Sequence, residues 1–193
     1  IGAPWQAEDS YDYHRREDVD PAPILRKEFE ITKPVKSARF YGTGLGYFEL
    51  YLNGERVSDE YFVPNETNYD YREKLGERLI PVEDPFNEYT VMYLSYDLTD
   101  KIQQGCNAVG AILGNGFYDL VFRRFVMGYG TPRFFGQILI KYEDGSREVI
   151  ASDTTWKIEK SAIIYDQMYR GEHYDARLEH DGWASAGYDD TGW

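Results

Sequence analysis

Residues 48–57, which read FELYLNGERV, give the clearest indication of the fold of this chain. From Phe48 to Leu52 apolar residues alternate with polar or amphipathic ones, which is the period-two pattern of a strand with one buried face. The pair Asn53-Gly54 follows, and such a pair readily adopts the positive φ angles that a tight hairpin requires. The stretch therefore predicts two antiparallel strands joined by a short turn.

The same pattern extends outward in both directions. Four more segments alternate, and a sixth strand is expected at 108–113; the four are 25–32, 38–40, 92–96 and 136–142. Asp144-Gly145 supplies a second hairpin turn. Only Thr99–Ile102 reads as helical, as a single turn capped by Thr99 or Asp100 and ended by Gly105. We therefore predict an all-β fold, an antiparallel β-sandwich.

A glycine cluster precedes residues 48–57. Gly42, Gly44 and Gly46 resemble part of a dinucleotide-binding fingerprint, but that motif needs a glycine at position 47, which is Tyr47, and a helix after it. A strand follows instead. We interpret the cluster as a glycine-rich turn between two strands.

Composition restricts the partners. The chain has 193 residues, enough for one substantial core, and a formal net charge of −13. That charge opposes binding to phosphate backbones and to anionic membranes, so we expect neither nucleic acid nor membrane as a partner. Aromatic residues make up 17% of the chain, which suits strands and carbohydrate or protein surfaces. Cys106 is the sole cysteine, which excludes an intrachain disulfide.

The chain divides into three parts in this reading. Residues 1–23 carry many charges without periodic pattern and form an irregular lead-in. Residues 24–180 form the β-sandwich. Residues 181–193 are loop-like and are interpreted as the start of a linker or of a next domain, with the natural chain continuing beyond Trp193.

Several motifs, in order and at similar spacing, carry a family resemblance. They are GLGYFELYLNG at 44–54, LGNGFY at 113–118 and GEHYDARLE at 171–179, followed by Gly182-Trp183. Together with neighbouring residues they cover about 24–193. The chain resembles the N-terminal domain of glycoside hydrolase family 78 α-L-rhamnosidases, with Phe117 where Trp is common.

The resemblance implies a jelly-roll-like β-sandwich of the galactose-binding type, placed ahead of the catalytic domain of a bacterial, secreted or periplasmic enzyme. Members of the family release terminal α-L-rhamnose with two carboxylates that lie in a separate (α/α)6 barrel. No segment here predicts such a barrel. We therefore assign no catalytic residue to this chain and expect the glycosidase activity in the longer parent protein.

Three loops, 64–72, 115–119 and 170–177, combine aromatic rings with amide, carboxylate or guanidinium groups. Sugars offer hydroxyl groups for hydrogen bonds and C–H faces for stacking on rings. The function predicted is noncatalytic binding and presentation of L-rhamnose or rhamnose-containing glycans. The residues predicted to contact carbohydrate are Asn68, Tyr69, Asp70, Tyr118, Asp119, Glu172 and Asp175.

Calcium is the one cofactor considered, because some rhamnose-binding modules related to this family use it. Asn65 and Glu66 offer the hard oxygen ligands that calcium prefers, although their spacing matches no EF-hand loop.

Two alternatives stay open. The domain could be purely structural, stabilising the catalytic barrel by contact with other domains of the same polypeptide. It could also lend a loop, with Glu172 or Asp175, to the active site of the intact protein. For the loop at 170–177 a domain seam competes with a ligand site, since Arg177 can pair with Glu172 or Asp175.

Overall fold

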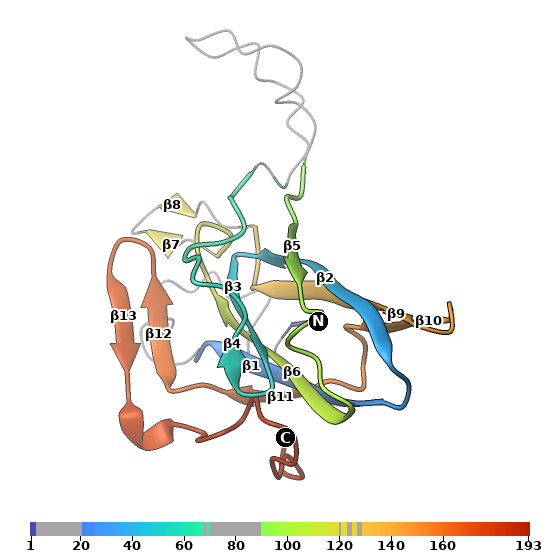
Figure 1. The fold of residues 1–193 in the computed structure, drawn as a ribbon. Coiled ribbons are helices and arrows are strands. Elements are labelled where there is room, and N and C mark those ends of the chain that lie inside the picture. Colours follow the sequence, from blue (N-terminus) through green and yellow to red (C-terminus); the bar gives the residue numbers. More distant parts are fainter. Residues whose placement is uncertain (3–20, 68, 70–89, 120, 123–124, 127–128) are drawn as a thin grey trace, which may run out of the picture.

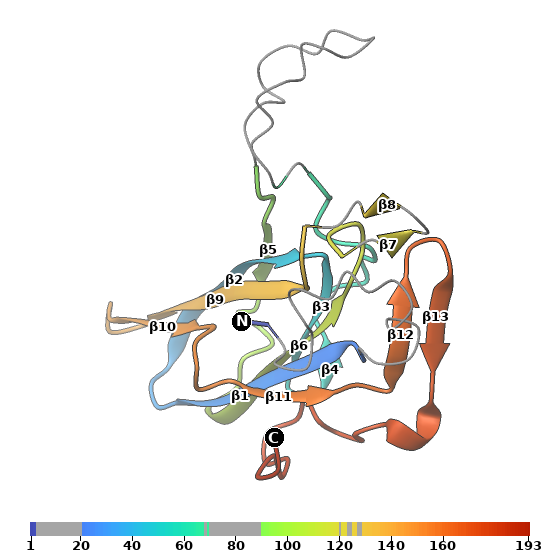
Figure 2. The same ribbon diagram turned by 180° about the vertical axis from the view of Figure 1, so that it is seen from behind.

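The structure is a computed structural model that describes residues 1–2, 21–67, 69, 90–119, 121–122, 125–126 and 129–193. Two antiparallel sheets face each other (Figures 1 and 2). The larger has the order β11-β1-β6-β3-β4, with strands Lys157–Lys160, Pro23–Ile31, Gly105–Gly114, Tyr47–Leu52 and Glu55–Arg56. The smaller has the order β10-β9-β2-β5, with strands Arg147–Ala151, Arg133–Tyr142, Val35–Leu45 and Leu94–Asp97. This arrangement confirms the predicted antiparallel all-β fold.

The core lies between the two sheets and follows from the alternation in the sequence. Phe48, Leu50 and Leu52 of β3 are each at most 3% exposed. Across the interior the Phe48 ring lies 5.4 Å from that of Phe134 on β9, at a steep angle. Each such buried side chain contributes about 1.5 to 3 kcal/mol by leaving water. The two sheets are therefore held together by packing of the apolar residues that the period-two pattern predicted to be buried.

Both predicted hairpins are present, with one difference in turn geometry. Asn53 and Gly54 have φ angles of 52° and 87° and join β3 to β4. In the β9–β10 hairpin only Gly145 has a positive φ, 83°, and its amide donates to the Tyr142 carbonyl at 3.0 Å. The second turn therefore uses a single left-handed residue, not a positive-φ pair.

The interpretation of the glycine cluster as a turn was wrong for two of its three members. Strand β2 runs straight through Gly42 and Gly44, and the chain turns at Gly46, where φ is 92°. Gly42 pairs with Gly136 of β9, and a Cβ at position 42 would overlap the Phe40 ring. Gly42 therefore makes room for an aromatic side chain of the core.

The predicted helical turn is a single hydrogen-bonded turn after β5. The Ile102 amide donates to the Leu98 carbonyl at 3.0 Å. The residue that caps it is Asp97, whose carboxylate accepts the Thr99 amide at 3.0 Å, in place of Thr99 or Asp100. Gly105 begins β6 with a φ of 89°.

Two small hairpins lie at one end of the sandwich. One consists of β7 (Val121–Phe122) and β8 (Phe125–Val126), the other of β12 (Ile163–Gln167) and β13 (Gly171–Tyr174). Figure 1 shows them on the same side of the molecule. The predicted loop at 170–177 is thus mostly strand β13 followed by the short 3-10 helix η3, Ala176–Leu178. Within the described ranges no helix is long and apolar enough to cross a membrane.

Candidate functional site

Three tyrosines meet at the end of the sandwich near these hairpins. The ring of Tyr69 lies 5.2 Å from the ring of Tyr118 and 5.2 Å from that of Tyr129, edge to face in both cases. Tyr118 and Tyr129 are stacked at 5.8 Å. Tyr118 is buried, and the other two are half-buried. The structure therefore brings together Tyr69 and Tyr118, which were both predicted, with Tyr129, which was not.

Glu66 ties the first loop to the second. Its Oε1 accepts the backbone amide of Phe117 at 2.6 Å. Burial is the main cause of the raised pKa of its carboxyl. Asn65 is exposed. The two predicted calcium ligands thus differ in their surroundings, and Glu66 already has a structural role.

Among the described residues no three His, Cys, Asp or Glu are grouped to hold a metal ion. The predicted sugar contacts Asn68 and Asp70 lie outside the described residues. Calcium binding by Asn65 and Glu66 stays a prediction.

Asp166 of β12 is the centre of an acidic cluster in the same region. Its two carboxylate oxygens accept the backbone N–H of Asn115 at 3.3 and 3.0 Å. The side-chain amide of Asn115 donates to the backbone carbonyl of Asp166 at 3.1 Å. Burial, together with the negative charges of Glu172 and Asp119, raises the pKa of Asp166 to about 6. The predicted residues Asp119 and Glu172 therefore both lie near Asp166, which was not predicted as a site residue.

Replacing Asp166 with Asn removes a charge whose burial opposes folding. The Asp166 carboxyl binds its proton more tightly in the folded chain than in the unfolded chain. Its protonated form therefore stabilises the folded chain below about pH 4, and this stabilisation is lost as the pH rises through about 6. We expect Asp166→Asn to raise the free energy of unfolding by about 1 to 2 kcal/mol near pH 8. The gain should vanish below about pH 4, as urea unfolding at a series of pH values would measure.

The exposed Asp100 provides the matched control, since Asp100→Asn removes the same charge far from this cluster. It should change stability by less than about 0.5 kcal/mol at every pH. A loss of stability for Asp166→Asn near pH 8 would mean that a cation, and not a proton, neutralises Asp166.

Asp175 lies apart from this cluster. Its carboxylate caps η3 by accepting the Arg177 amide at 3.1 Å and pairs with the Arg177 guanidinium at 2.8 and 2.6 Å. These contacts hold the pKa of Asp175 at about 2. Of the two partners considered for Arg177, the structure selects Asp175. The carboxylate is therefore engaged in local structure.

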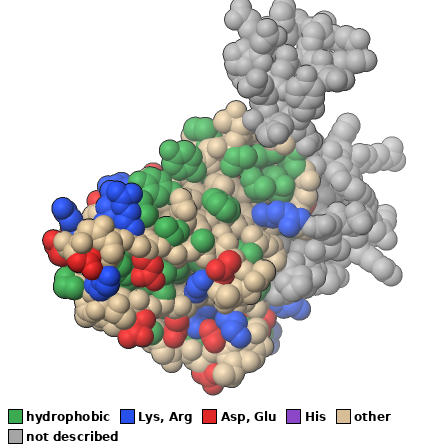
Figure 3. Space-filling model, turned by 90° about the vertical axis from the view of Figure 1, so that its right-hand side faces the viewer, with side chains coloured by type: hydrophobic (Ala, Val, Ile, Leu, Met, Phe, Trp, Pro, Cys, Tyr) green, Lys and Arg blue, Asp and Glu red, His purple; other side chains and the backbone are tan. Residues whose placement is uncertain are grey.

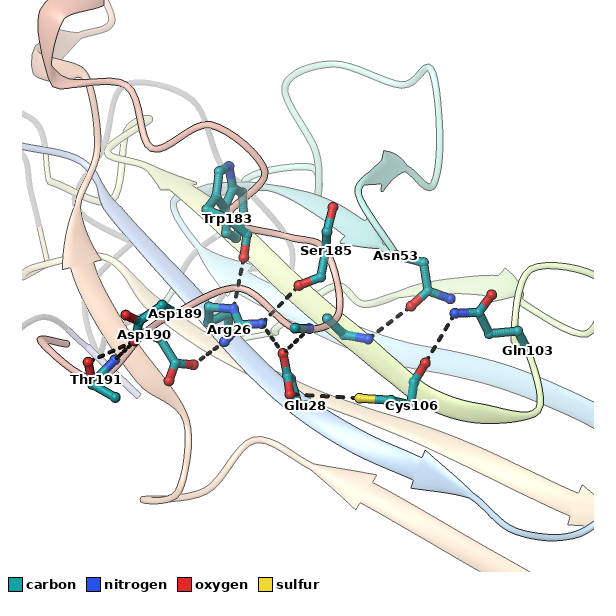
Figure 4. A network of polar contacts seen from close by, with 12 residues as sticks. Arg26, Glu28, Asn53, Gln103, Cys106, Trp183, Ser185, Asp189, Asp190 and Thr191 are labelled. Atoms are coloured by element: carbon teal, nitrogen blue, oxygen red, sulfur yellow. Dashed lines mark hydrogen bonds and ion pairs between the residues drawn. The ribbon is translucent and has the colours of Figure 1, made fainter.

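A second polar centre fastens the C-terminal segment, residues 181–193, to the outer face of the larger sheet (Figure 4). Arg26 of β1 is 0% exposed. Its Nε donates to the Trp183 carbonyl at 2.8 Å, and Nη2 donates to the Ser185 carbonyl at 3.0 Å. The guanidinium also forms ion pairs with Glu28, at 2.7 Å, and with Asp190. The segment expected to be a linker thus packs on the sandwich.

The fold and these features define an antiparallel β-sandwich domain with a tyrosine-rich, acidic cluster at one end and a C-terminal segment held by a buried arginine. The sequence-family model of the alpha-L-rhamnosidase N-terminal domain matches residues 33–77 and 73–193 of this chain. The chain belongs to this family, as its motifs predicted.

Relatives agree in sequence and in fold. An alpha-L-rhamnosidase of Formosa agariphila is 35% identical over 179 residues, which are 89% of this chain and 17% of that protein. The structure of the Dictyoglumus thermophilum alpha-L-rhamnosidase has 39% identity and a TM-score of 0.74 over 91% of this chain and 17% of that chain. The Streptomyces avermitilis enzyme, solved in complex with L-rhamnose, has 34% identity and a TM-score of 0.75 over 90% of this chain and 15% of its own. The chain thus spans less than a fifth of the length of each.

Proposed function

We propose that this domain is a noncatalytic carbohydrate-binding domain that presents rhamnose-containing glycans to the catalytic part of an α-L-rhamnosidase. Family membership supports the parent activity, and the relatives named above are alpha-L-rhamnosidases. A secreted or periplasmic location belongs to the same proposal, because polymeric glycans are encountered outside the cytoplasm.

The observation that carries the proposal is the end cluster, defined as Glu66, Tyr69, Tyr118, Asp119, Tyr129, Asp166 and Glu172. Segments from separate parts of the chain converge there: the loops that carry Glu66 and Tyr69 and that carry Tyr118 and Asp119, the segment at Tyr129, and the β12–β13 hairpin. They bring phenol rings beside carboxylates. Rings stack on the C–H faces of a sugar, and carboxylates accept bonds from its hydroxyl groups. Tyr169, which is 63% exposed and lies 6.0 Å from the Phe117 ring, extends the aromatic surface outward. A neutral sugar also suits a chain of net charge −13.

Isothermal titration of the chain with L-rhamnose tests this proposal. We expect a saturable heat with a dissociation constant in the millimolar range, and Glu172→Gln should weaken binding about fivefold to tenfold by removing one charged hydrogen-bond acceptor. Asp175→Asn serves as the matched control. Because the Asp175 carboxylate already pairs with Arg177, this substitution should leave the dissociation constant unchanged. No heat at millimolar sugar, with and without calcium, would contradict carbohydrate binding.

A second candidate function, interdomain support, rests on an exposed apolar surface. On the outer face of the smaller sheet, Phe135 is 64% exposed and Val149 51%, and Tyr93 just before β5 is 67% exposed. On the face drawn in Figure 3, hydrophobic side chains occur mainly in the upper part, and charged ones mainly to the left and below. Such surfaces often mark contacts with other protein parts. Under this alternative, Phe135→Ser would lower the melting temperature of the full-length protein while leaving that of this domain unchanged.

A further inference from the structure

A cleft of about 300 Å³ lies between the larger sheet and the residues that lead into the C-terminal segment. Ile24 of β1 and Ile112 of β6 contribute apolar side chains to its lining. Tyr51 and Trp183 stand at its side, with ring centroids 5.3 Å apart. Its volume is at the lower end of the range for small-molecule pockets and therefore suits one sugar ring and not an extended chain. We call this the seam cleft.

The aromatic wall of the seam cleft is held in place before any ligand arrives. The Trp183 carbonyl accepts Arg26 Nε at 2.8 Å, and Figure 4 shows this residue beside the buried guanidinium. The Trp183 ring lies directly over Gly110 of β6, where a Cβ would overlap it. A wall fixed from both its backbone and its ring loses little freedom on binding, which favours affinity for a small ligand.

The rim of the seam cleft is acidic and rich in hydrogen-bonding groups. Glu179 and Asp181 contribute carboxylates, and both residues are exposed. The Tyr174 hydroxyl donates to Glu179 Oε1 at 2.5 Å and orients that carboxylate. His180 is held by the Lys160 carbonyl, which lies 3.1 Å from its Nε2. Two carboxylates disfavour an anionic ligand, whereas hydroxyl groups can donate to them.

We propose that the seam cleft is a second carbohydrate subsite that takes one neutral pyranose. The C–H face of the sugar packs on Trp183 and Tyr51, and its hydroxyl groups donate to Glu179 and Asp181. The subsite is separate from the end cluster. In the β12–β13 hairpin, Asp166 pairs with Glu172 near the turn, whereas Ile163 pairs with Tyr174 at the open end. Opposite ends of one hairpin therefore border the two sites.

Tryptophan fluorescence separates the two sites. The chain has four Trp residues; with Trp5 and Trp193 replaced by Phe, Trp183 reports on the cleft and Trp156, 7% exposed in the core, serves as a constant. We expect millimolar L-rhamnose to change the emission in a saturable way. The double variant Glu179→Gln/Asp181→Asn should weaken this response about tenfold without lowering the melting temperature. Glu172→Gln, in the end cluster, should leave it unchanged.

The outcomes distinguish this proposal from the proposed function. Heat on titration that Glu172→Gln weakens, with no Trp183 response, would overturn the seam subsite and leave the end cluster standing. A Trp183 response that Glu179→Gln/Asp181→Asn weakens would support the seam subsite even if Glu172→Gln had no effect. A response to methylammonium but not to L-rhamnose would also overturn the proposal, since the cleft would then recognise a cation.

Discussion

Arg26→Met is expected to lower the free energy of unfolding by about 3 kcal/mol, the low end of the cost of breaking a buried ion pair. The side chain is fully buried, so Met keeps most of the packing but makes none of the hydrogen bonds. The carbonyls of Trp183 and Ser185 lose their donor, and Glu28 and Asp190 lose their counter-charge. The cost stays near the low end because both carboxylates are partly exposed and can be hydrated.

Urea unfolding measures this loss, and hydrogen exchange localises it. We expect exchange to quicken mainly in the C-terminal segment, because Arg26 holds that segment to the sheet. Arg39→Met is the matched control: Arg39 pairs with Asp97 at 2.8 Å, but both side chains are substantially exposed, so less than about 1 kcal/mol is at stake. Equal losses for the two variants would contradict a special role of the buried guanidinium.

Asn107→Ala is expected to cost about 3 kcal/mol, because four hydrogen bonds of one buried side chain are lost together. Asn107 is 0% exposed. Its amide donates to the carbonyls of Gln103 and Gly105 at 2.7 and 2.9 Å. Its Oδ1 accepts the Asn53 side chain at 2.9 Å and the Gln103 backbone amide at 3.0 Å. This amide thus links the β3–β4 turn to the start of β6.

Thermal unfolding followed by circular dichroism should show Asn107→Ala melting several degrees lower, with the same secondary structure before the transition. Gln103→Ala provides the comparison, since its exposed amide makes a single bond of 3.1 Å to the Cys106 carbonyl. That change should cost less than about 1 kcal/mol. If Asn107→Ala were as mild as Gln103→Ala, the turn would not depend on the buried amide.

The candidate site was only partly predictable. Tyr118 and Asp119 were found because aromatic and acidic residues follow one another directly at a strand end, and Glu172 because it belongs to an acidic, aromatic loop motif. Asp166 was missed, since nothing in its strand reveals that β12 brings it under Asn115. Asp175 belongs to the same motif as Glu172, but its carboxylate pairs with Arg177. Residue type marks a candidate, and only chain packing decides its neighbours.

The antiparallel β-sandwich was predictable from the sequence, because the period-two alternation and the turn pairs depend on residues that are close together along the chain. In β1 the alternation places Leu25, Phe29 and Ile31 on one face, and all three are buried in the core. The same alternation would leave Arg26 in water. Arg26 is buried because long-range packing covers it: the hydrogen bonds to the covering segment span 157 and 159 positions of the chain. A local pattern predicts on which face of a strand a residue lies, and long-range packing determines whether that face is exposed to solvent.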